Sequence, residues 1–277
     1  MMCKVLKVSR SSYYSWSKRG PSKRAIENQI LVKHILKIYE KSKGTYGSPR
    51  ITEELKVNYV HVSRPRVARL MKKANIRSIT RKKFVATTDS KHDFPVAPNR
   101  LNRQFKVNLQ GKVWVSDITY IRTLEGWLYL TIIMDLADRK IIGWALSNSM
   151  HASATIIPAW EMAILNRPLN ANLLFHSDRG VQYACIEFRK LLFQNQFVTQ
   201  SMSRKGNCWD NAVAESFFKT LKTEWVYTYK YVSRKQASAS IFEYIETWYN
   251  TQRRHSSLNY LSPNEYGELL NKQKLAA

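Results

Sequence analysis

The stretch KVWVSDITYIRT, residues 112–123, alternates along its length and is rich in β-branched and aromatic residues, a pattern that predicts a β-strand. Asp117 interrupts this strand between the apolar runs VWV and ITYI. Burying a carboxylate there costs free energy unless a partner or a metal ion compensates its charge. The stretch therefore predicts one strand of a sheet, with a carboxylate in it that binds a partner or a metal ion.

A second carboxylate stands at the end of another apolar run. LLFHSDRGVQY, residues 173–183, begins as a buried strand and stops at Asp178. A simple turn is the alternative explanation, since turn residues usually end such runs. If this strand pairs beside residues 112–123, the side chains of Asp117 and Asp178 can converge. Glu215 lies early in a later predicted helix, which Phe217 and Phe218 can dock on the sheet, so three carboxylates can meet.

The order of predicted elements gives the fold class. Strands are expected at 112–123, 126–139, 141–149, 173–178 and 198–203, and helices at 153–167, 185–197 and within 204–225. Short links between the first three strands indicate an antiparallel meander. The order β-β-β-α-β-α-β-α predicts an α/β fold, a mixed five-stranded sheet with flanking helices. An RNase H-like fold requires this order.

The charge of the chain points to a polyanionic partner. The 277 residues have a formal net charge of +25 and are 44% hydrophobic, so a folded core is expected. Residues 1–100 hold 24 Lys and Arg against 6 Asp and Glu, a net charge of +18. Solubility, the alternative explanation, requires a charge of only about 2–8 in a small domain. The first third of the chain is therefore predicted to bind nucleic acid.

Helical patterns in this basic third predict a small all-α helix-turn-helix domain. A first helix is expected at 25–42, with Ile30, Leu31, His34, Ile35 and Ile38 near one face. Ser48 and Ser63 are the expected N-caps of the next two helices, each close to a proline. The last helix has an apolar face and a basic face, the latter formed by Arg64, Arg66, Arg69, Lys72 and Lys73. We expect this basic face to contact DNA in the major groove, the alternative being a solvated helix. The run RSITRKKF, 77–84, would add contacts to phosphates.

Four regions are expected along the chain: a basic helix-turn-helix region at 1–90, a proline-bearing linker at 91–107, the catalytic core at 108–230 and a helical extension at 231–277. The three cysteines, Cys3, Cys185 and Cys208, form no CxxC pair, so neither a disulfide framework nor a zinc cluster is predicted. No apolar run approaches the roughly 20 residues of a membrane span. A cytoplasmic protein without a membrane partner, associated with the nucleoid when bound to DNA, is expected.

The remaining charged residues of the core divide into expected ligands and expected bystanders. Lys219 and Lys222 share a helix face with Glu215, and Lys222 is well placed to hold a phosphate, unless this face is merely solvated. Three convergent carboxylates repel one another unless cations neutralise them, and their oxygens favour Mg²⁺ or Mn²⁺. Two such ions about 3.5–4 Å apart suit in-line attack at phosphorus. The other acids are expected elsewhere: Asp135 and Asp138 in turns or at the surface, Glu161 and Glu187 in solvent, and Asp210 capping the last core helix.

The blocks VWVSDITYI, LLFHSDRGVQY and SMSRKGNCWDNAVAESFFKTLKTE closely resemble the catalytic blocks of bacterial insertion-sequence transposases with a retroviral-integrase-like core. GTYGSPRITEEL and YNTQRRHSSLNYLSPNEY resemble the same family, specifically its second-reading-frame (OrfB) product. The resemblance implies a catalytic and metal-binding triad of Asp117, Asp178 and Glu215, with Lys222 as the trailing basic residue. It also implies cutting at element ends, strand transfer by the freed 3′-hydroxyl, and terminal inverted repeats and target DNA as substrates. A multimer on paired ends and an upstream-frame (OrfA) partner or fusion are implied as well.

Two other functions fit parts of the sequence. The first is a DNA-binding regulator or transposition inhibitor with a catalytically idle core, against which the intact acidic triad argues. The second is a ribonuclease of the same fold, against which the basic helix-turn-helix and Lys222 argue. The segment HSSLNYLSP, 255–263, is expected to be a turn that packs the final helix on the core.

Overall fold

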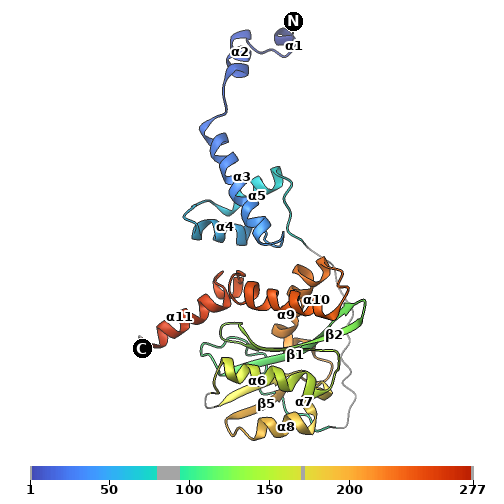
Figure 1. Cartoon of the computed structure of the whole chain (residues 1–277). Coiled ribbons are helices and arrows are strands. Elements are labelled where there is room, and N and C mark those ends of the chain that lie inside the picture. The colour runs from blue at the N-terminus through green and yellow to red at the C-terminus, as the bar shows by residue number, and fades with distance from the viewer. Residues whose placement is uncertain (1, 80–93, 170–171, 276–277) are drawn as a thin grey trace. The chain divides into compact units, whose positions relative to one another are not determined.

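The computed structural model describes residues 2–79, 94–169 and 172–275, which form two compact units, residues 1–80 and 81–277. The first unit is all helical, with α1 (Met2–Val5), α2 (Arg10–Lys18), α3 (Lys23–Lys41), α4 (Ser48–Val57) and α5 (Arg64–Lys73) (Figure 1). In this part of the chain, residues 80–84 of the predicted phosphate-binding run and 91–93 of the predicted linker lie outside the described residues.

The helical core of the first unit joins α3, α4 and α5. Apolar side chains of all three helices are buried together: Leu31, Ile35, Ile38, Ile51, Leu55, Val67, Leu70 and Met71. Two residues of the predicted α3 face differ, since Ile30 is 52% exposed and His34 also faces solvent. The N-cap of α4 is Gly47 and not Ser48, one residue earlier than predicted, whereas Ser63 is the N-cap of α5 as expected.

The second unit contains the predicted mixed five-stranded sheet. Its strands are β1 (Val113–Thr123), β2 (Gly126–Asp135), β3 (Ile141–Ser147), β4 (Leu173–Ser177) and β5 (Val198–Met202), in the spatial order β3-β2-β1-β4-β5. β1, β2 and β3 form the antiparallel meander, and β4 pairs in parallel with both β1 and β5. The fold class expected from the order of elements is confirmed.

Helices that alternate with the strands or follow them in the chain flank this sheet. They are α6 (Ile156–Asn166), α7 (Val181–Ala184), α8 (Ile186–Phe193), α9 (Ala212–Glu224), α10 (Arg234–Phe242), a π-helical segment (Glu243–Tyr249) and α11 (Pro263–Leu275), with short 3₁₀ turns at Ala152–Ala154, Cys208–Asn211, Val226–Thr228 and Ser256–Leu258. α6 packs on β2 and β3, and α9 packs on β1 (Figure 1). None of the helices in the described ranges is both long enough and apolar enough to cross a bilayer.

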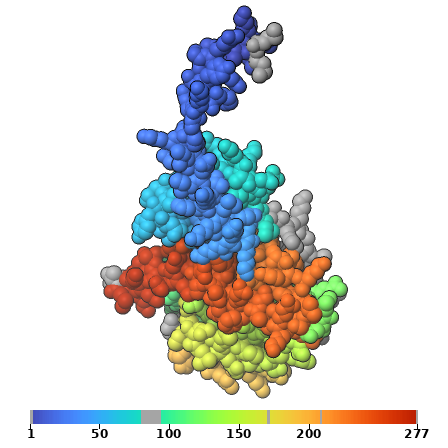
Figure 2. Space-filling view, turned by 45° about the horizontal axis from the view of Figure 1, so that its top comes forward, coloured from blue at the N-terminus to red at the C-terminus, as the bar shows by residue number. Residues whose placement is uncertain are grey.

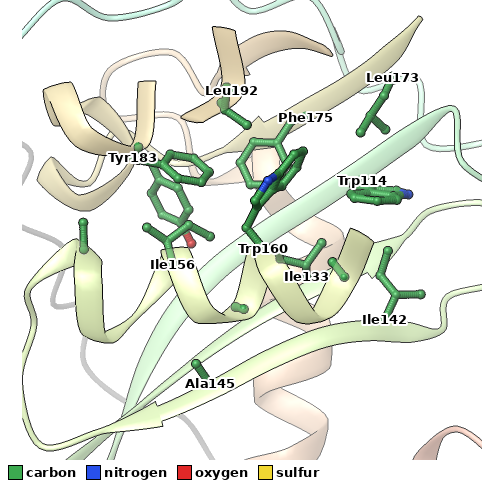
Figure 3. Packing of buried hydrophobic residues seen from close by; sticks show 14 of the residues in the cluster. Trp114, Ile133, Ile142, Ala145, Ile156, Trp160, Leu173, Phe175, Tyr183 and Leu192 are labelled. Atoms are coloured by element: carbon green, nitrogen blue, oxygen red, sulfur yellow. The ribbon is translucent and has the colours of Figure 1, made fainter. Parts of the chain in front are cut away.

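An aromatic core holds α6, α7 and α8 on the sheet. Trp160 of α6 lies within 5.6 Å of the rings of Trp114 and Phe175, and all three are fully buried (Figure 3). At Gly143 in β3 an added Cβ would lie 2.1 Å from the Ala159 carbonyl oxygen, so only glycine allows α6 to approach this closely. Burying such large rings contributes much of the stability that fixes β1 beside β4.

Asp135 and Asp138 are buried, contrary to the expectation that they lie in turns or at the surface. Arg167 forms ion pairs of 2.6 Å with Asp135 and 2.7 Å with Asp138. The backbone N–H of Gly111 and the indole of Trp114 donate further hydrogen bonds to Asp135. These carboxylates are therefore neutralised within the fold and fasten the end of β2 to α6. Sequence spacing gave no sign of Arg167, which lies 32 residues away.

The C-terminal segment packs back on the core, as the sequence predicts for residues 255–263. His255 and Leu261 form an isolated β-bridge, and the side chain of Arg254 pairs with Glu265 at 2.8 Å. Asn250 accepts from the backbone of Asn264 and exchanges two hydrogen bonds with Ile141 of β3. α11 is thus tied to the edge of the sheet through one asparagine.

Candidate active site

Asp117 lies within β1, and Asp178 directly follows β4, the parallel neighbour of β1. The register pairs Val113 with Leu174, Trp114 with Phe175 and Val115 with His176. Val115 and His176 are the last pair between β1 and β4, and Asp117 and Asp178 each follow that pair by two positions. The pairing of β1 with β4 was the condition for the two side chains to converge, and the structure meets it.

The DRG sequence after β4 has a local structural role. The backbone N–H of Gly180 donates to Asp178 Oδ1 at 2.8 Å, and Arg179 Nε donates to the carbonyl of Ser203 at 2.6 Å. A Cβ at residue 180 would lie 3.0 Å from Asp178 Oδ1. Arg179 therefore joins the ends of β4 and β5, while Gly180 leaves room for the carboxylate beside it. The turn is real, and it also orients the acid.

The three acids influence one another electrostatically. Burial raises the pKa of Asp117 well above its ordinary value, and the charges of Asp178 and Glu215 raise it further. Burial, followed by the charge of Asp178, also raises the pKa of Glu215. The side chain of Glu215 is exposed in the first turn of α9, while Asp117 and Asp178 are half-buried. The three carboxylates thus share one neighbourhood, and their mutual repulsion is only partly compensated.

This donor set fits a divalent cation. Hard carboxylate oxygens are the ligands that Mg²⁺ and Mn²⁺ prefer, and a cation would remove the repulsion that adds to the effect of burial on these pKa values. Within residues 2–79, 94–169 and 172–275, no three His, Cys, Asp or Glu side chains are already gathered closely enough to hold an ion together. Glu215, on a helix that follows a loop, is the exposed member of the set.

Lys222 lies close to the acids, whereas Lys219 points into solvent. Burial lowers the pKa of Lys222, and the nearby charge of Asp117 acts in the opposite direction. Its ammonium group also lies over the ring of Tyr120, 5.1 Å from the centroid. Lys219, one turn earlier, is exposed. Of the two predicted lysines, Lys222 is the one that the structure brings to the carboxylates.

Tyr183 and Ser116 form a buried hydroxyl pair near the acids and were not identified from the sequence. Tyr183 is buried, its hydroxyl is 2.9 Å from Ser116 Oγ, and Ser116 in turn donates to the carbonyl of Ile132. Burial raises the pKa of the Tyr183 phenol well above its ordinary value, and the charges of Asp178 and Asp117 add to the effect. The tyrosine therefore stays neutral in the neighbourhood of the two aspartates. Its position five residues after Asp178 gave no periodic signal.

Asp210 anchors the loop before α9 and does not cap that helix, which corrects the prediction. Asn211 is the N-cap of α9. Asp210 is fully buried and accepts hydrogen bonds from the backbone and guanidinium of Arg204, from Arg103 and from Asn99. These contacts hold the pKa of Asp210 well below its ordinary value, chiefly through the Arg204 side chain. The loop that leads to Glu215 is thus fixed at its base.

Residues 99–103, part of the predicted linker, pack on this loop. Arg103 and Asn99 bind Asp210, and the backbone N–H of Arg100 donates to Ser201 Oγ at 2.9 Å. Leu101 is buried. Residues 99–103 are therefore attached to the loop before α9 and to β5.

The basic face of α5 is mostly open to solvent. Arg64, Arg69, Lys72 and Lys73 are exposed. Arg66 differs, because its guanidinium donates to Asn28 at 2.9 and 3.0 Å and pairs with Glu27 at 3.0 Å, both on α3. Arg66 therefore links α5 to α3. As predicted, Glu161 and Glu187 are exposed on their helices.

Comparison with known proteins agrees with this arrangement. The chain matches the family described as HTH-like domain over residues 25–84, and two families described as integrase core domain over residues 108–208 and 196–263. It is 43% identical to the insertion element IS600 31 kDa protein of Shigella sonnei over 96% of this chain and 97% of the relative. It is 38% identical to transposase InsF for insertion sequence IS3A of Escherichia coli, over 96% of this chain and 92% of InsF.

Among solved structures, the catalytic core domain of BIV integrase matches 59% of this chain and 99% of its own, with a TM-score of 0.43 and 15% identity. The extent and identity of the sequence matches decide the family. The chain belongs to the insertion-sequence transposases that combine an HTH-like domain with an integrase core, the family that includes InsF.

Proposed function

We propose that Asp117, Asp178 and Glu215 are the catalytic and metal-binding residues of this transposase. The observation that supports this most directly is the equivalent register of Asp117 and Asp178 on adjacent parallel strands. The mutual influence of the three acids on their pKa values adds to it. The proposed reaction is cleavage of DNA at element ends, followed by transfer of the freed 3′-hydroxyl into target DNA.

In this proposal the carboxylates hold divalent cations, Mg²⁺ or Mn²⁺, and two ions are expected. Bound there, the cations would supply activation of the attacking water or 3′-hydroxyl and stabilisation of the leaving oxygen. The residues of the chain do the rest. Gly180 fixes one oxygen of Asp178 through its N–H, Tyr183 keeps a neutral hydroxyl near the aspartates, and Lys222 presents an ammonium group to the phosphate being cut.

The helical unit is proposed to bind the terminal inverted repeats. The exposed cations of α5 (Arg64, Arg69, Lys72 and Lys73) support phosphate contact, which orients a protein on the duplex without reading its sequence. Arg66 is better suited to holding α5 on α3 than to direct contact. The full assembly is proposed to be a homo-multimer on paired ends that works with, or fused to, the upstream-frame (OrfA) protein. The boundaries 1–90, 91–107, 108–230 and 231–277 remain our proposal for the domains.

The proposed chemistry is tested by replacing one acid at a time. In Asp117→Asn, one carboxylate charge is lost at nearly constant shape, and we expect cleavage and strand transfer of end-containing DNA in Mg²⁺ to fall on the order of 100-fold or more. Glu187→Gln, an exposed acid on α8, is the matched control and should retain full activity. An Asp117→Asn protein as active as the wild type would exclude the proposed triad.

A further inference from the structure

A partly exposed aromatic surface lies at the far end of the β1–β2 hairpin. We call it the hairpin patch and define it by Tyr120, Trp127 and Tyr227, with the cations Arg122 and Lys222. Trp127 is 46% exposed and Tyr227 is 42% exposed. Large aromatic side chains grouped in contact with water usually mark a place where something binds. In Figure 2 the tip of the hairpin, in green, lies at the surface beside the orange segment that includes α10.

The strand register brings these side chains together. Tyr120 is paired with Tyr129, and Arg122 is paired with Trp127, so all four project from one face of the hairpin. The rings of Tyr120 and Trp127 pack edge to face, with centroids 5.1 Å apart. Burial raises the pKa of Tyr120, and the hydroxyls of Tyr129 and Tyr227 contribute to the increase. Tyr227, from the segment after α9, therefore lies close enough to Tyr120 to interact with it.

Backbone and side-chain hydrogen bonds hold the patch in shape. The N–H of Leu124 donates to the carbonyl of Tyr231 at 3.1 Å, and Arg234 Nε donates to the carbonyl of Trp127 at 3.1 Å. α10 lies beside the hairpin and contributes Arg234 (Figure 1). Trp127 is thus exposed on a hairpin that hydrogen bonds hold in place, and a partner would bind a surface that is already formed.

The patch is continuous with the proposed active site through Lys222. Its ammonium group lies 5.1 Å from the centre of the Tyr120 ring and interacts with the charge of Asp117. Tyr120 follows Asp117 by three residues on β1, so the two side chains project from opposite faces of the strand, and Lys222 is the link between them. Arg122 is exposed opposite Trp127. A path from the acids therefore meets a cation, two aromatic rings and a second cation in turn.

We propose that the hairpin patch binds unpaired nucleotides of the DNA substrate, with bases stacked on Trp127 and Tyr227 and phosphates near Arg122 and Lys222. Sites for single-stranded nucleic acid combine cations that follow the backbone with aromatic rings on which bases stack. The bases of an intact duplex are already stacked on one another, so they offer no face to these rings. A second copy of the chain is the less favoured partner, because each copy has a net charge of +25. This proposal rests on the proposed function, since it places the single-stranded DNA next to the carboxylates of the proposed active site.

Binding of a single strand by the full chain tests the proposal without requiring catalysis. The probe is a single-stranded oligonucleotide of mixed sequence, about 12 nucleotides long, with one 5-iododeoxyuridine for photocrosslinking. Trp127→Ala should weaken its binding about tenfold and remove the crosslink that we expect in the peptide containing Trp127. Trp127→Phe, which keeps an aromatic face, should restore most of the affinity. Leu124→Ala is the matched control, because Leu124 is 83% exposed on the same hairpin and is not aromatic.

Each outcome separates the alternatives. Unchanged affinity in Trp127→Ala, or an equal loss in Leu124→Ala, would overturn the proposal. Equal weakening for a duplex of the same length would also overturn it, as would a change of oligomeric state without a change in affinity for the strand. The Asp117→Asn protein should bind the single strand as the wild type does. The two proposals can therefore fail separately. If Asp117→Asn cleaves DNA as well as the wild type does, the proposed chemistry fails, while loss of single-strand binding in Trp127→Ala still supports the hairpin patch.

Discussion

Asp117 and Asp178 occupy equivalent positions on adjacent parallel strands, each two residues beyond the last pair in the register, Val115 and His176. At this point the ladder between β1 and β4 ends and the chain of β4 turns away, while β1 stays paired with β2 through Asp117 and Ile132. The backbone N–H of Ile118 donates to Asp117, and that of Gly180 donates to Asp178. The end of a parallel ladder thereby becomes a pair of oriented acids.

Divalent cations should stabilise the protein through these acids. Burial, and after it repulsion between the acids, raises the pKa values of Asp117 and Glu215. Because a cation would remove that repulsion, Mg²⁺ or Mn²⁺ should bind the folded state preferentially and raise its Tm. Thermal unfolding with and without Mg²⁺, at constant ionic strength, measures this effect. In the Asp117→Asn, Asp178→Asn double variant the Mg²⁺-dependent increase should disappear. An increase that survives in the double variant would place the ion elsewhere.

Gly180→Ala should disturb the site without unfolding the protein. The added Cβ would lie 3.0 Å from Asp178 Oδ1 and 3.1 Å from Gln182 Oε1, so the carboxylate must move. We expect the affinity for Mn²⁺, followed by calorimetry or by the dependence of cleavage on metal concentration, to fall about tenfold. Gly20→Ala is the control, because an added Cβ there has no neighbour within 4 Å. Equal metal affinities in both variants would contradict the tight fit around Asp178.

Asp210 should make the stability of the protein depend on acid. Its pKa is held below the ordinary value in the folded state, chiefly by Arg204, so its stabilising contribution is complete above the unfolded pKa and is lost as the pH falls through the folded value. Asp210→Asn should lower the free energy of unfolding by about 1–3 kcal/mol at neutral pH. It should also flatten the loss of stability on acidification.

Denaturant titrations from neutral to acidic pH measure both effects. Arg204→Ala alone should be milder than Asp210→Asn, because Arg103 and Asn99 still bind the carboxylate. If Asp210→Asn were as stable as the wild type at neutral pH, the anchoring role of this carboxylate would be refuted.

Two arginines of α5 should behave differently when replaced. Arg69 is exposed, so Arg69→Ala should weaken binding to duplex DNA at every sequence and reduce the slope of affinity against salt by about one ion. Arg66→Ala should also lower the thermal stability of the helical unit, because it removes the hydrogen bonds to Asn28 and the ion pair with Glu27. Filter binding over a range of salt, together with thermal unfolding, distinguishes them. Arg69→Lys, which keeps the charge, should restore most of the binding.

The sequence by itself determined the elements and their order. The alternation in KVWVSDITYIRT and the apolar run LLFHS are local properties of the chain. Because strand formation depends on such local patterns, both strands were predicted nearly to their ends. The meander followed from the short links between its strands, and the later strands from their own sequence patterns. The helix boundaries were less certain: the α4 cap lies one residue earlier than expected, because Gly47 and Ser48 both suit the position.

Only the tertiary structure decided which charged residues serve the fold and which are available for chemistry. Asp135 and Asp117 both belong to strands of one hairpin, yet Arg167 neutralises Asp135 in the core, while the charges of Asp178 and Glu215 act on Asp117. Asp210 is held by Arg103 and Arg204 and does not cap α9. A carboxylate's role depends on the charges within a few ångströms of it, and folding brings those charges from positions that sequence spacing does not link.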